Sequence, residues 1–207
     1  MKRTAIAILV IVIAFPALAQ RTMRDFIITM PDSLVEYLNK TKRTEMVDFY
    51  DMGVKAETFN LLQGSTVLDS LTSTFADISV NKSQRMQLAL LPLHEADTLI
   101  CMVNSFLGEA PESEVHFFNT QWMPMPSKDF LDEVTASQLM QRPDTMDVER
   151  YDELVRFFDP VMIAAVLTPD SNLIFQLSTP MVTTEEKKQL DIIMLQKKFK
   201  WNRQRFN

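Results

Sequence analysis

The sequence predicts an α+β protein in which helices pack on one side of antiparallel sheets. Two observations support this prediction. Five consecutive apolar segments of strand length are separated only by short polar turns, and segments with helical spacing of apolar residues precede and follow them. Consecutive strands with short turns pair antiparallel. Two similar helix-plus-sheet lobes are one arrangement compatible with this pattern.

Two helical segments are expected ahead of the strands. Pro31 and Asp32 open the first, in which apolar residues then recur at i, i+3 and i+4. Thr44 is expected to cap the second, which ends at Gly53. We interpret them as one broken helix, or two short helices, laid on a sheet.

The five strand segments are rich in Val, Ile, Leu, Phe and Thr, and Asn, Asp, Ser and Pro separate them. They cover residues 66–71, 75–80, 85–93, 98–106 and 114–120.

Further helices and strands are expected after residue 126. Ser127 can cap a short helix reaching Val134, and Asp147 can cap another that ends before Pro160. Thr183 and Glu186 have the spacing of a capping box, which predicts a third helix.

Two strand segments, 161–167 and 172–178, form the last predicted hairpin before a C-terminal strand or hairpin over 199–206. The hairpins over residues 88–100 and 163–175 resemble each other. An internal duplication and a chance resemblance both remain open.

A cleavable leader is indicated at the N-terminus. Lys2-Arg3 precedes an unbroken apolar run over residues 5–15, and a small-x-small cleavage site ends at Ala19. The run is shorter than the about 20 residues that span a bilayer, so a retained anchor is the less favoured alternative. Gln20, and not a cysteine, follows the site, which argues against a lipoprotein. We expect residues 1–19 to be a signal peptide cut after Ala19, and a periplasmic or secreted mature protein without a transmembrane segment.

The composition is that of an ordinary globular protein, with 46% hydrophobic and 23% charged residues. The residues after the leader suffice for one large domain or two small ones. The two prolines in Pro124-Met125-Pro126 mark the best candidate boundary. We therefore expect an N-terminal lobe over 20–123 and a C-terminal lobe over 124–207, with one continuous domain as the alternative.

The net charge of −6 becomes more negative when the leader is removed, so nucleic acid is not an expected partner. The charge is unevenly distributed, because residues 185–207 contain seven Lys and Arg against three Asp and Glu. Such a basic end can contact an acidic partner or anionic lipid, or it can be an ordinary solvated surface.

Residue types that concentrate reactivity are scarce. Three glycines leave no Gly-x-Ser-x-Gly motif and no Gly-rich phosphate loop. The turn His94-Glu95-Ala96-Asp97 is interpreted as a polar hairpin tip rather than a weak metal site, and His116 as an ordinary strand residue. The single cysteine, Cys101, makes no internal disulfide and is expected to be buried. We expect no catalytic residue, no metal and no cofactor.

Short motifs follow one another along nearly the whole mature chain. They are Met30-Pro31-Asp32-Ser33-Leu34, Arg43, Met46-Val47-Asp48-Phe49, Gly64-Ser65, Leu90-Leu91-Pro92, Gly108, Pro111-Glu112-Ser113, Phe117-Phe118, Trp122 and the closing Trp201-Asn202 with Phe206. In this order they resemble an uncharacterised family of small secreted proteins of Gram-negative gut bacteria, classed as a domain of unknown function. The family's terminal strand is Trp-Asn-Gly-x-x-Phe, and here Arg203 stands in place of the glycine. The resemblance implies export and an α+β fold, and it implies no reaction.

Together these observations favour a non-enzymatic interaction or ligand-binding protein of the periplasm or cell envelope, with an unknown protein or envelope component as partner. A hydrolase that uses scattered carboxylates on envelope or glycan substrates is the alternative. The expected contact surface consists of the basic C-terminal segment and one loop, namely Lys198, Lys200, Arg203 and Arg205 with Pro111, Glu112 and Ser113.

Overall fold

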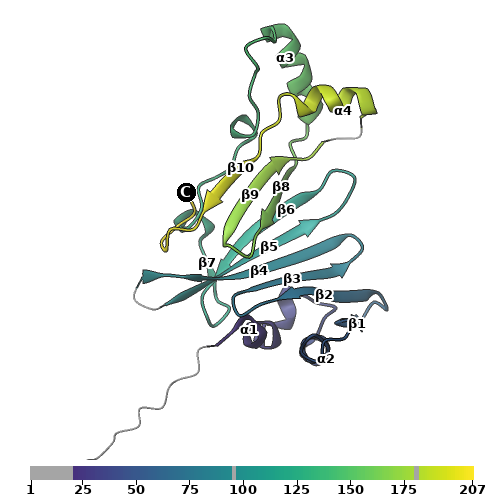
Figure 1. The fold of residues 1–207 in the computed structure, drawn as a ribbon, viewed down its shortest axis with the longest axis vertical. Helices are drawn as coiled ribbons and strands as arrows, with labels where there is room; N and C mark the ends of the chain where they lie inside the picture. Colours follow the sequence, from purple (N-terminus) through teal and green to yellow (C-terminus); the bar gives the residue numbers. More distant parts are fainter. Residues whose placement is uncertain (1–20, 95–96, 180–181) are drawn as a thin grey trace, which may run out of the picture.

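The computed structural model describes residues 21–94, 97–179 and 182–207, so the predicted signal peptide lies outside the described residues. Its centre is a seven-stranded antiparallel sheet whose strands follow one another in sequence order (Figure 1). The strands are β1 (Glu57–Phe59), β2 (Ser65–Leu71), β3 (Phe75–Asn81), β4 (Gln84–Pro92), β5 (Thr98–Phe106), β6 (Glu112–Phe118) and β7 (Pro124–Met125).

A second, three-stranded antiparallel sheet has the order β10-β9-β8 and lies against one face of the large sheet (Figure 1). Its strands are β8 (Ile163–Leu167), β9 (Asn172–Leu177) and β10 (Lys197–Lys200). The α-helices are α1 (Met23–Thr29), α2 (Lys40–Asp51), α3 (Val148–Val155) and α4 (Thr184–Asp191), and the 3-10 turns are η1 (Asp32–Leu34), η3 (Ser127–Asp129), η4 (Ala136–Gln138) and η5 (Arg156–Phe158).

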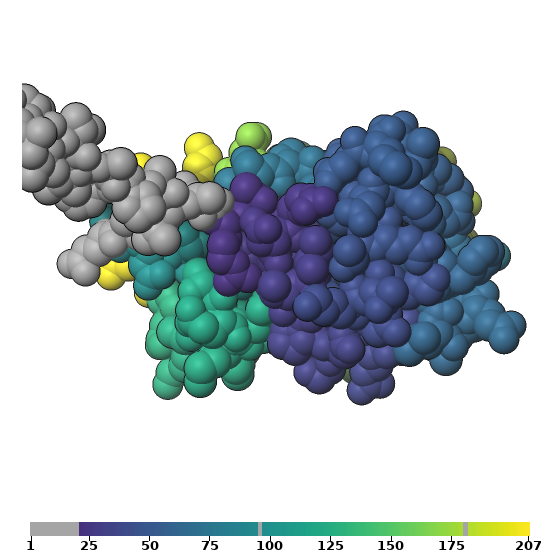
Figure 2. Space-filling view, turned by 90° about the horizontal axis from the view of Figure 1, so that it is seen from below, coloured from purple at the N-terminus to yellow at the C-terminus, as the bar shows by residue number. Residues whose placement is uncertain are grey.

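The large sheet is covered on both faces. In β4, Met86 and Leu88 point to the face that α1 and α2 cover, whereas Ala89 and Leu91 point to the small sheet. Figure 2 shows the helical face, with the N-terminal segments packed over it. Burial on both faces explains why the central strands are nearly continuous apolar runs instead of alternating apolar and polar residues.

The core between the two sheets contains side chains from both predicted lobes. Leu91 and Cys101 of the large sheet share it with Leu167, Phe199 and Phe206. The division into lobes 20–123 and 124–207 stays a prediction, as does the duplication of the two hairpins, which form β4–β5 and β8–β9.

The fold class and most elements are confirmed. The predicted strand over 98–106 coincides with β5, and the other four in the large sheet differ by one or two residues at an end. Asp147 caps α3 through the backbone N–H of Arg150, and Thr183 and Glu186 form the capping box of α4. Among the described residues, no helix has the length and hydropathy that a bilayer crossing requires.

The C-terminal hairpin is confirmed as well. Trp201 and Phe206 form an antiparallel bridge, and the side chain of Asn202 accepts hydrogen bonds from the backbone N–H groups of Gln204 and Arg205. Arg203, at the position of the family's glycine, has φ = 73°. This is the left-handed region that a glycine adopts without steric cost.

The N-terminal helices differ from the prediction. The helix α2 begins at Lys40 with Asn39 as its cap, and not at Thr44, because the Asn39 side chain accepts from the backbone N–H of Lys42. The segment after Pro31 forms only the turn η1, and α1 was not predicted.

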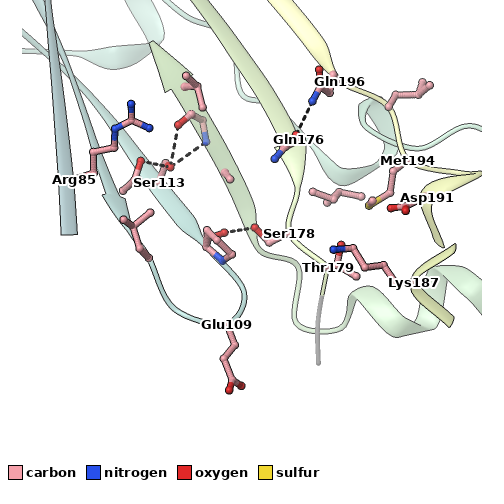
Figure 3. A pocket seen from close by; sticks show the side chains of 18 residues that line it. Arg85, Glu109, Ser113, Gln176, Ser178, Thr179, Lys187, Asp191, Met194 and Gln196 are labelled. Atoms are coloured by element: carbon pink, nitrogen blue, oxygen red, sulfur yellow. Dashed lines mark hydrogen bonds between the residues drawn. The ribbon is translucent and has the colours of Figure 1, made fainter. Parts of the chain in front are cut away.

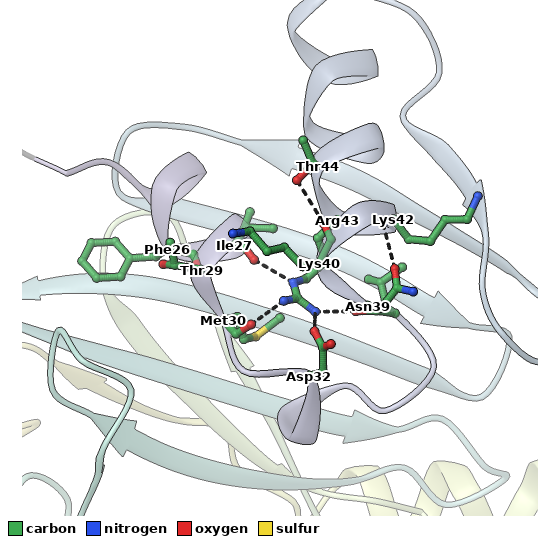
Figure 4. A network of polar contacts seen from close by, with 11 residues as sticks. Phe26, Ile27, Thr29, Met30, Asp32, Asn39, Lys40, Lys42, Arg43 and Thr44 are labelled. Carbon is green, nitrogen blue, oxygen red and sulfur yellow. Dashed lines mark hydrogen bonds and ion pairs between the residues drawn. The ribbon is translucent and has the colours of Figure 1, made fainter.

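The buried side chain of Arg43 explains why α1, η1 and α2 are separate short segments (Figure 4). Its guanidinium donates to the backbone carbonyls of Ile27, Met30 and Leu38 and to the carboxylate of Asp32. The chain between α1 and α2 therefore wraps around one cation instead of continuing as a helix.

The helix expected from Ser127 to Val134 is also wrong, because only the turn η3 forms. The backbone carbonyl of Phe130 accepts a hydrogen bond from the N–H of Phe206, and Phe130, Leu131 and Val134 pack on the core between the sheets. Tertiary packing thus overrides the local capping signal.

Candidate functional site

A groove of about 560 Å³ runs along the β8 side of the small sheet (Figure 3). Its floor is formed by β8 and β9. One wall is Arg85 of β4 with the β5–β6 hairpin, and the other is α4 with the segment that leads to β10. The lining residues are Arg85, Ser105, Leu107, Glu109, Pro111, Ser113, Ala164, Ala165, Val166, Gln176, Leu177, Ser178, Thr179, Lys187, Asp191, Met194, Leu195 and Gln196.

The groove depends on how β8 is fixed to the large sheet. β8 is an edge strand, so one row of its backbone groups has no neighbouring strand. The Ser113 hydroxyl of β6 accepts from the N–H of Ala165 (3.0 Å) and donates to its carbonyl (3.3 Å), and the N–H of Leu167 donates to the Gln87 side chain. Side chains of the large sheet therefore occupy this edge and attach β8, part of the groove floor, to the large sheet.

A polar network supports the Arg85 wall. Asp77, on β3, is buried and receives two hydrogen bonds from the Arg85 guanidinium, and the side-chain amide of Gln87 lies 3.4 Å from the same carboxylate. The hydrogen bond with Asp77 raises the pKa of Arg85. The positive charge of Arg85 is therefore neutralised within the wall.

Two charged side chains without a direct ion pair lie on the opposite wall. Lys187 and Asp191 are exposed on α4, one helical turn apart, and neither has an ion-pair partner among the described residues. Glu109 stands at the tip of the β5–β6 hairpin, and in Figure 3 its carboxylate points away from Asp191. The two acids do not converge on one point of the groove.

The floor carries a pair of side-chain amides. The Nε2 group of Gln196 donates to Oε1 of Gln176 over 2.7 Å (Figure 3). Gln176 lies directly opposite Ala164 in the β8–β9 ladder, so a small side chain leaves space beside the amides. The groove thus combines amide and hydroxyl groups with aliphatic surface.

The structure separates the predicted contact residues. Pro111 and Ser113 line the groove, and the Ser178 hydroxyl donates to the Pro111 carbonyl, whereas Glu112 is exposed and does not line it. Lys198 and Lys200 are exposed on β10, outside the groove lining.

The remaining basic residues follow β10. Arg203 lies in the C-terminal turn, and Arg205 pairs with Asp132. The loop and the basic segment are therefore two surfaces and not one.

Sequence reasoning missed most of the groove, above all Gln176, Lys187, Asp191 and Gln196. Gln176 is an outward-facing polar residue in an otherwise apolar strand, and this interrupted apolar pattern was the available signal. Nothing in the sequence indicates that Gln196 lies beside it.

A second cavity, of about 370 Å³, lies between η1 and the segment around Trp122. Trp122 has φ = 62°, and its buried indole N–H has no hydrogen-bond partner in the described part of the chain. His116, in the same lining, pairs with Glu114 at 3.2 Å. The indole nitrogen is buried, so this donor does not open into the cavity.

Within the described ranges, no group of three or more His, Cys, Asp or Glu side chains could hold a metal ion. The turn at His94 lies partly outside the described residues, because Glu95 and Ala96 are not among them. Cys101 is buried in β5, and removal from water raises the pKa of its thiol. The thiol is therefore not poised as a nucleophile.

Comparisons with known proteins support the fold. No curated protein matches the chain. A solved structure, described as a domain of an uncharacterized protein from Porphyromonas gingivalis W83, is similar with a TM-score of 0.75 and 18% sequence identity; the match covers 89% of this chain and 98% of that one. Because a family model matches residues 16–206, the chain belongs to the family described as "Protein of unknown function (DUF3256)".

Proposed function

We propose that the mature chain is an exported, non-enzymatic binding protein of the periplasm or cell envelope, whose ligand occupies the groove beside β8 and β9. The groove itself carries this proposal. Its volume of about 560 Å³ lies within the range of about 300–1,000 Å³ that is usual for ligand sites.

The chemistry of the lining supports binding over catalysis. Amides, hydroxyls and aliphatic side chains recognise a ligand by hydrogen bonds and apolar contact, and the nearest acids, Glu109 and Asp191, stand on opposite walls. The alternative, a carboxylate-dependent hydrolase acting on envelope or glycan substrates, requires two acids to act on one bond. In this groove the two acids would be Glu109 and Asp191.

The basic segment supplies a second proposed contact surface. Lys198, Lys200 and Arg203 have no ion-pair partner among the described residues, and the first two lie on an exposed edge strand. Unpaired cations on such an edge attract acidic partners, although lysines there also prevent unwanted strand pairing.

Export is supported by the basic, apolar and small-residue pattern that ends at Ala19. We expect the protein recovered from the periplasm to begin at Gln20 by mass spectrometry. An intact Met1 start on protein recovered from the cytosol would contradict export.

Binding is tested by pull-down from native envelope extract with the variant Ala164→Leu, which fills the groove floor. Ser137→Leu, at an exposed position outside the groove lining, is the matched control. We expect Ala164→Leu to lose the bound component and Ser137→Leu to keep it, with unchanged melting temperatures. Equal capture by both variants would place the binding surface elsewhere, and the reversals Lys198→Glu, Lys200→Glu and Arg203→Glu then test the basic segment.

An assay for cleavage of envelope glycan tests the hydrolase alternative. If the protein cleaves envelope glycan and Asp191→Asn or Glu109→Gln abolishes the cleavage, the hydrolase holds. We expect no cleavage by either the wild type or the variants.

A further inference from the structure

We propose that the groove binds an extended peptide segment, and that the amides of Gln176 and Gln196 recognise the backbone N–H and C=O of one of its residues. This inference rests on the proposed binding function, because it names the chemical class of ligand for the same groove.

The amide pair complements the backbone groups of one extended residue. The hydrogen bond from Gln196 Nε2 to Gln176 Oε1 leaves the Nε2 donor of Gln176 and the Oε1 acceptor of Gln196 without another partner among the described residues. A residue in an extended chain presents one N–H donor and one C=O acceptor on the same side. Its C=O can therefore accept from Gln176 while its N–H donates to Gln196.

The surroundings of the pair suit a chain with aliphatic side chains. Ala164 lies opposite Gln176 in the ladder and leaves room for a backbone to approach. Val166 and Leu195, which also line the groove, are 38% and 40% exposed, and covering them removes apolar surface from water. Polar recognition in the centre with apolar contact beside it is the pattern of a peptide site.

Other ligand classes fit the lining less well. None of the described residues that line the groove is aromatic, whereas sugars and nucleobases are usually held by stacking on aromatic rings. A strongly anionic ligand lacks a suitable cation, because Arg85 is already bound to Asp77. Lys187 shares its wall with Asp191, which offsets its attraction for an anion.

The mode of recognition is through side chains and not through strand addition. The Ser113 hydroxyl already satisfies the backbone N–H and carbonyl of Ala165 at the free edge of β8, and Gln87 satisfies the N–H of Leu167. A peptide would have to displace both side chains to pair with this edge. The outer face of the small sheet, where the amides lie, remains open.

The test titrates the ¹⁵N-labelled mature protein with an array of capped tripeptides that combines Ala, Val, Leu and Met at each position. We expect at least one member to shift the side-chain amide resonances of Gln176 and Gln196. The affinity should fall by roughly 3- to 10-fold in Gln176→Leu, the equivalent of one hydrogen bond, and by a similar factor when an ester replaces the recognised amide. Gln204→Leu, in the exposed C-terminal turn, should leave the affinity unchanged.

The peptide assignment is overturned if no member binds at millimolar concentration, or if Gln176→Leu and the ester leave the affinity unchanged. Pull-down with Ala164→Leu separates the two proposals. If that variant loses an envelope component while the array fails, the groove still binds a ligand and only the peptide class is wrong.

Discussion

The hydroxyl of Ser113 accepts a hydrogen bond from the backbone N–H of Ala165 at 3.0 Å, across 52 residues of sequence. Ser113 belongs to the large sheet and Ala165 to the edge strand of the small one. The Ser105 hydroxyl lies 2.8 Å from that of Ser113, so both hydroxyls can be satisfied together. This contact fixes the angle at which β8 meets the large sheet, and with it the shape of the groove.

Replacement of Ser113 by alanine is expected to destabilise the protein by about 1–3 kcal/mol, because it leaves buried backbone groups of Ala165 without a partner. Urea unfolding followed by circular dichroism measures this change. Ser105→Ala should cost less, since the Ser113–Ala165 bonds survive. A smaller loss for Ser113→Ala than for Ser105→Ala would contradict this role.

Arg43→Met is expected to cost at least about 3 kcal/mol. The change leaves three backbone carbonyls and the Asp32 carboxylate without their donor, at a position that is 1% exposed. Arg24→Met is the matched control, because the Arg24 side chain is 42% exposed and its ion pairs with Asp48 and Asp51 are worth about 0–1 kcal/mol. Similar losses in the two variants would show that the Arg43 network contributes little.

Arg203→Gly is expected to stabilise the protein by about 1 kcal/mol. The residue has φ = 73°, where a Cβ atom is unfavourable and glycine is not. Arg203→Ala removes the same charge but keeps a Cβ atom, so it should bring no such gain. Thermal unfolding of the two variants distinguishes backbone strain from charge, and equal melting temperatures would exclude the strain.

Low pH is expected to destabilise the first turn of α1, because it protonates the carboxylate of Asp25. A hydrogen bond from the Thr22 backbone N–H, at 2.8 Å, lowers the pKa of Asp25 below its usual 3.8. Because the folded pKa is the lower one, the stabilisation is complete above the unfolded pKa and is lost as the pH falls through the folded pKa.

Asp25→Asn should therefore reduce the loss of stability between pH 7 and pH 3 by about 1 kcal/mol or less, since the group is only partly shielded from solvent. Asp170→Asn, in an exposed turn, is the control. Urea midpoints at the two pH values give the comparison. An unchanged pH dependence in Asp25→Asn would contradict the assignment.

Cys101 should react with a thiol reagent only when the protein opens. The thiol is buried, and desolvation raises its pKa, so both access and thiolate formation are suppressed. At pH 8 we expect labelling at least about 100-fold slower than in urea, corresponding to an opening free energy of about 3 kcal/mol. Rapid labelling of the folded protein would show that β5 is accessible.

The sequence predicts the large sheet well and the groove poorly. Strand β5 is recognisable because burial on both faces makes Leu99 to Val103 a continuous apolar run. The short helix α1 has only seven residues, and the wrapping of the chain around Arg43 depends on carbonyls from three separate positions. Local capping rules cannot predict such long-range contacts.

The groove forms because of strand pairing and sheet packing between residues that are far apart in the sequence. Gln176 and Gln196 meet because β10 pairs with β9, and Ser113 meets Ala165 because the sheets pack face to face. The sequence predicts a loop over Pro111-Glu112-Ser113, whereas Glu112 and Ser113 belong to β6. The spacing of these residues in the sequence does not indicate the Gln176–Gln196 contact or the Ser113–Ala165 contact.

Hydrogen–deuterium exchange of the mature protein, with and without native envelope extract, tests the binding groove most directly. We expect slower exchange in three segments that form the groove, residues 105–113, 163–177 and 187–196, and loss of this protection in Ala164→Leu. Unchanged exchange in these segments, or protection confined to α2 and β1, would contradict this expectation.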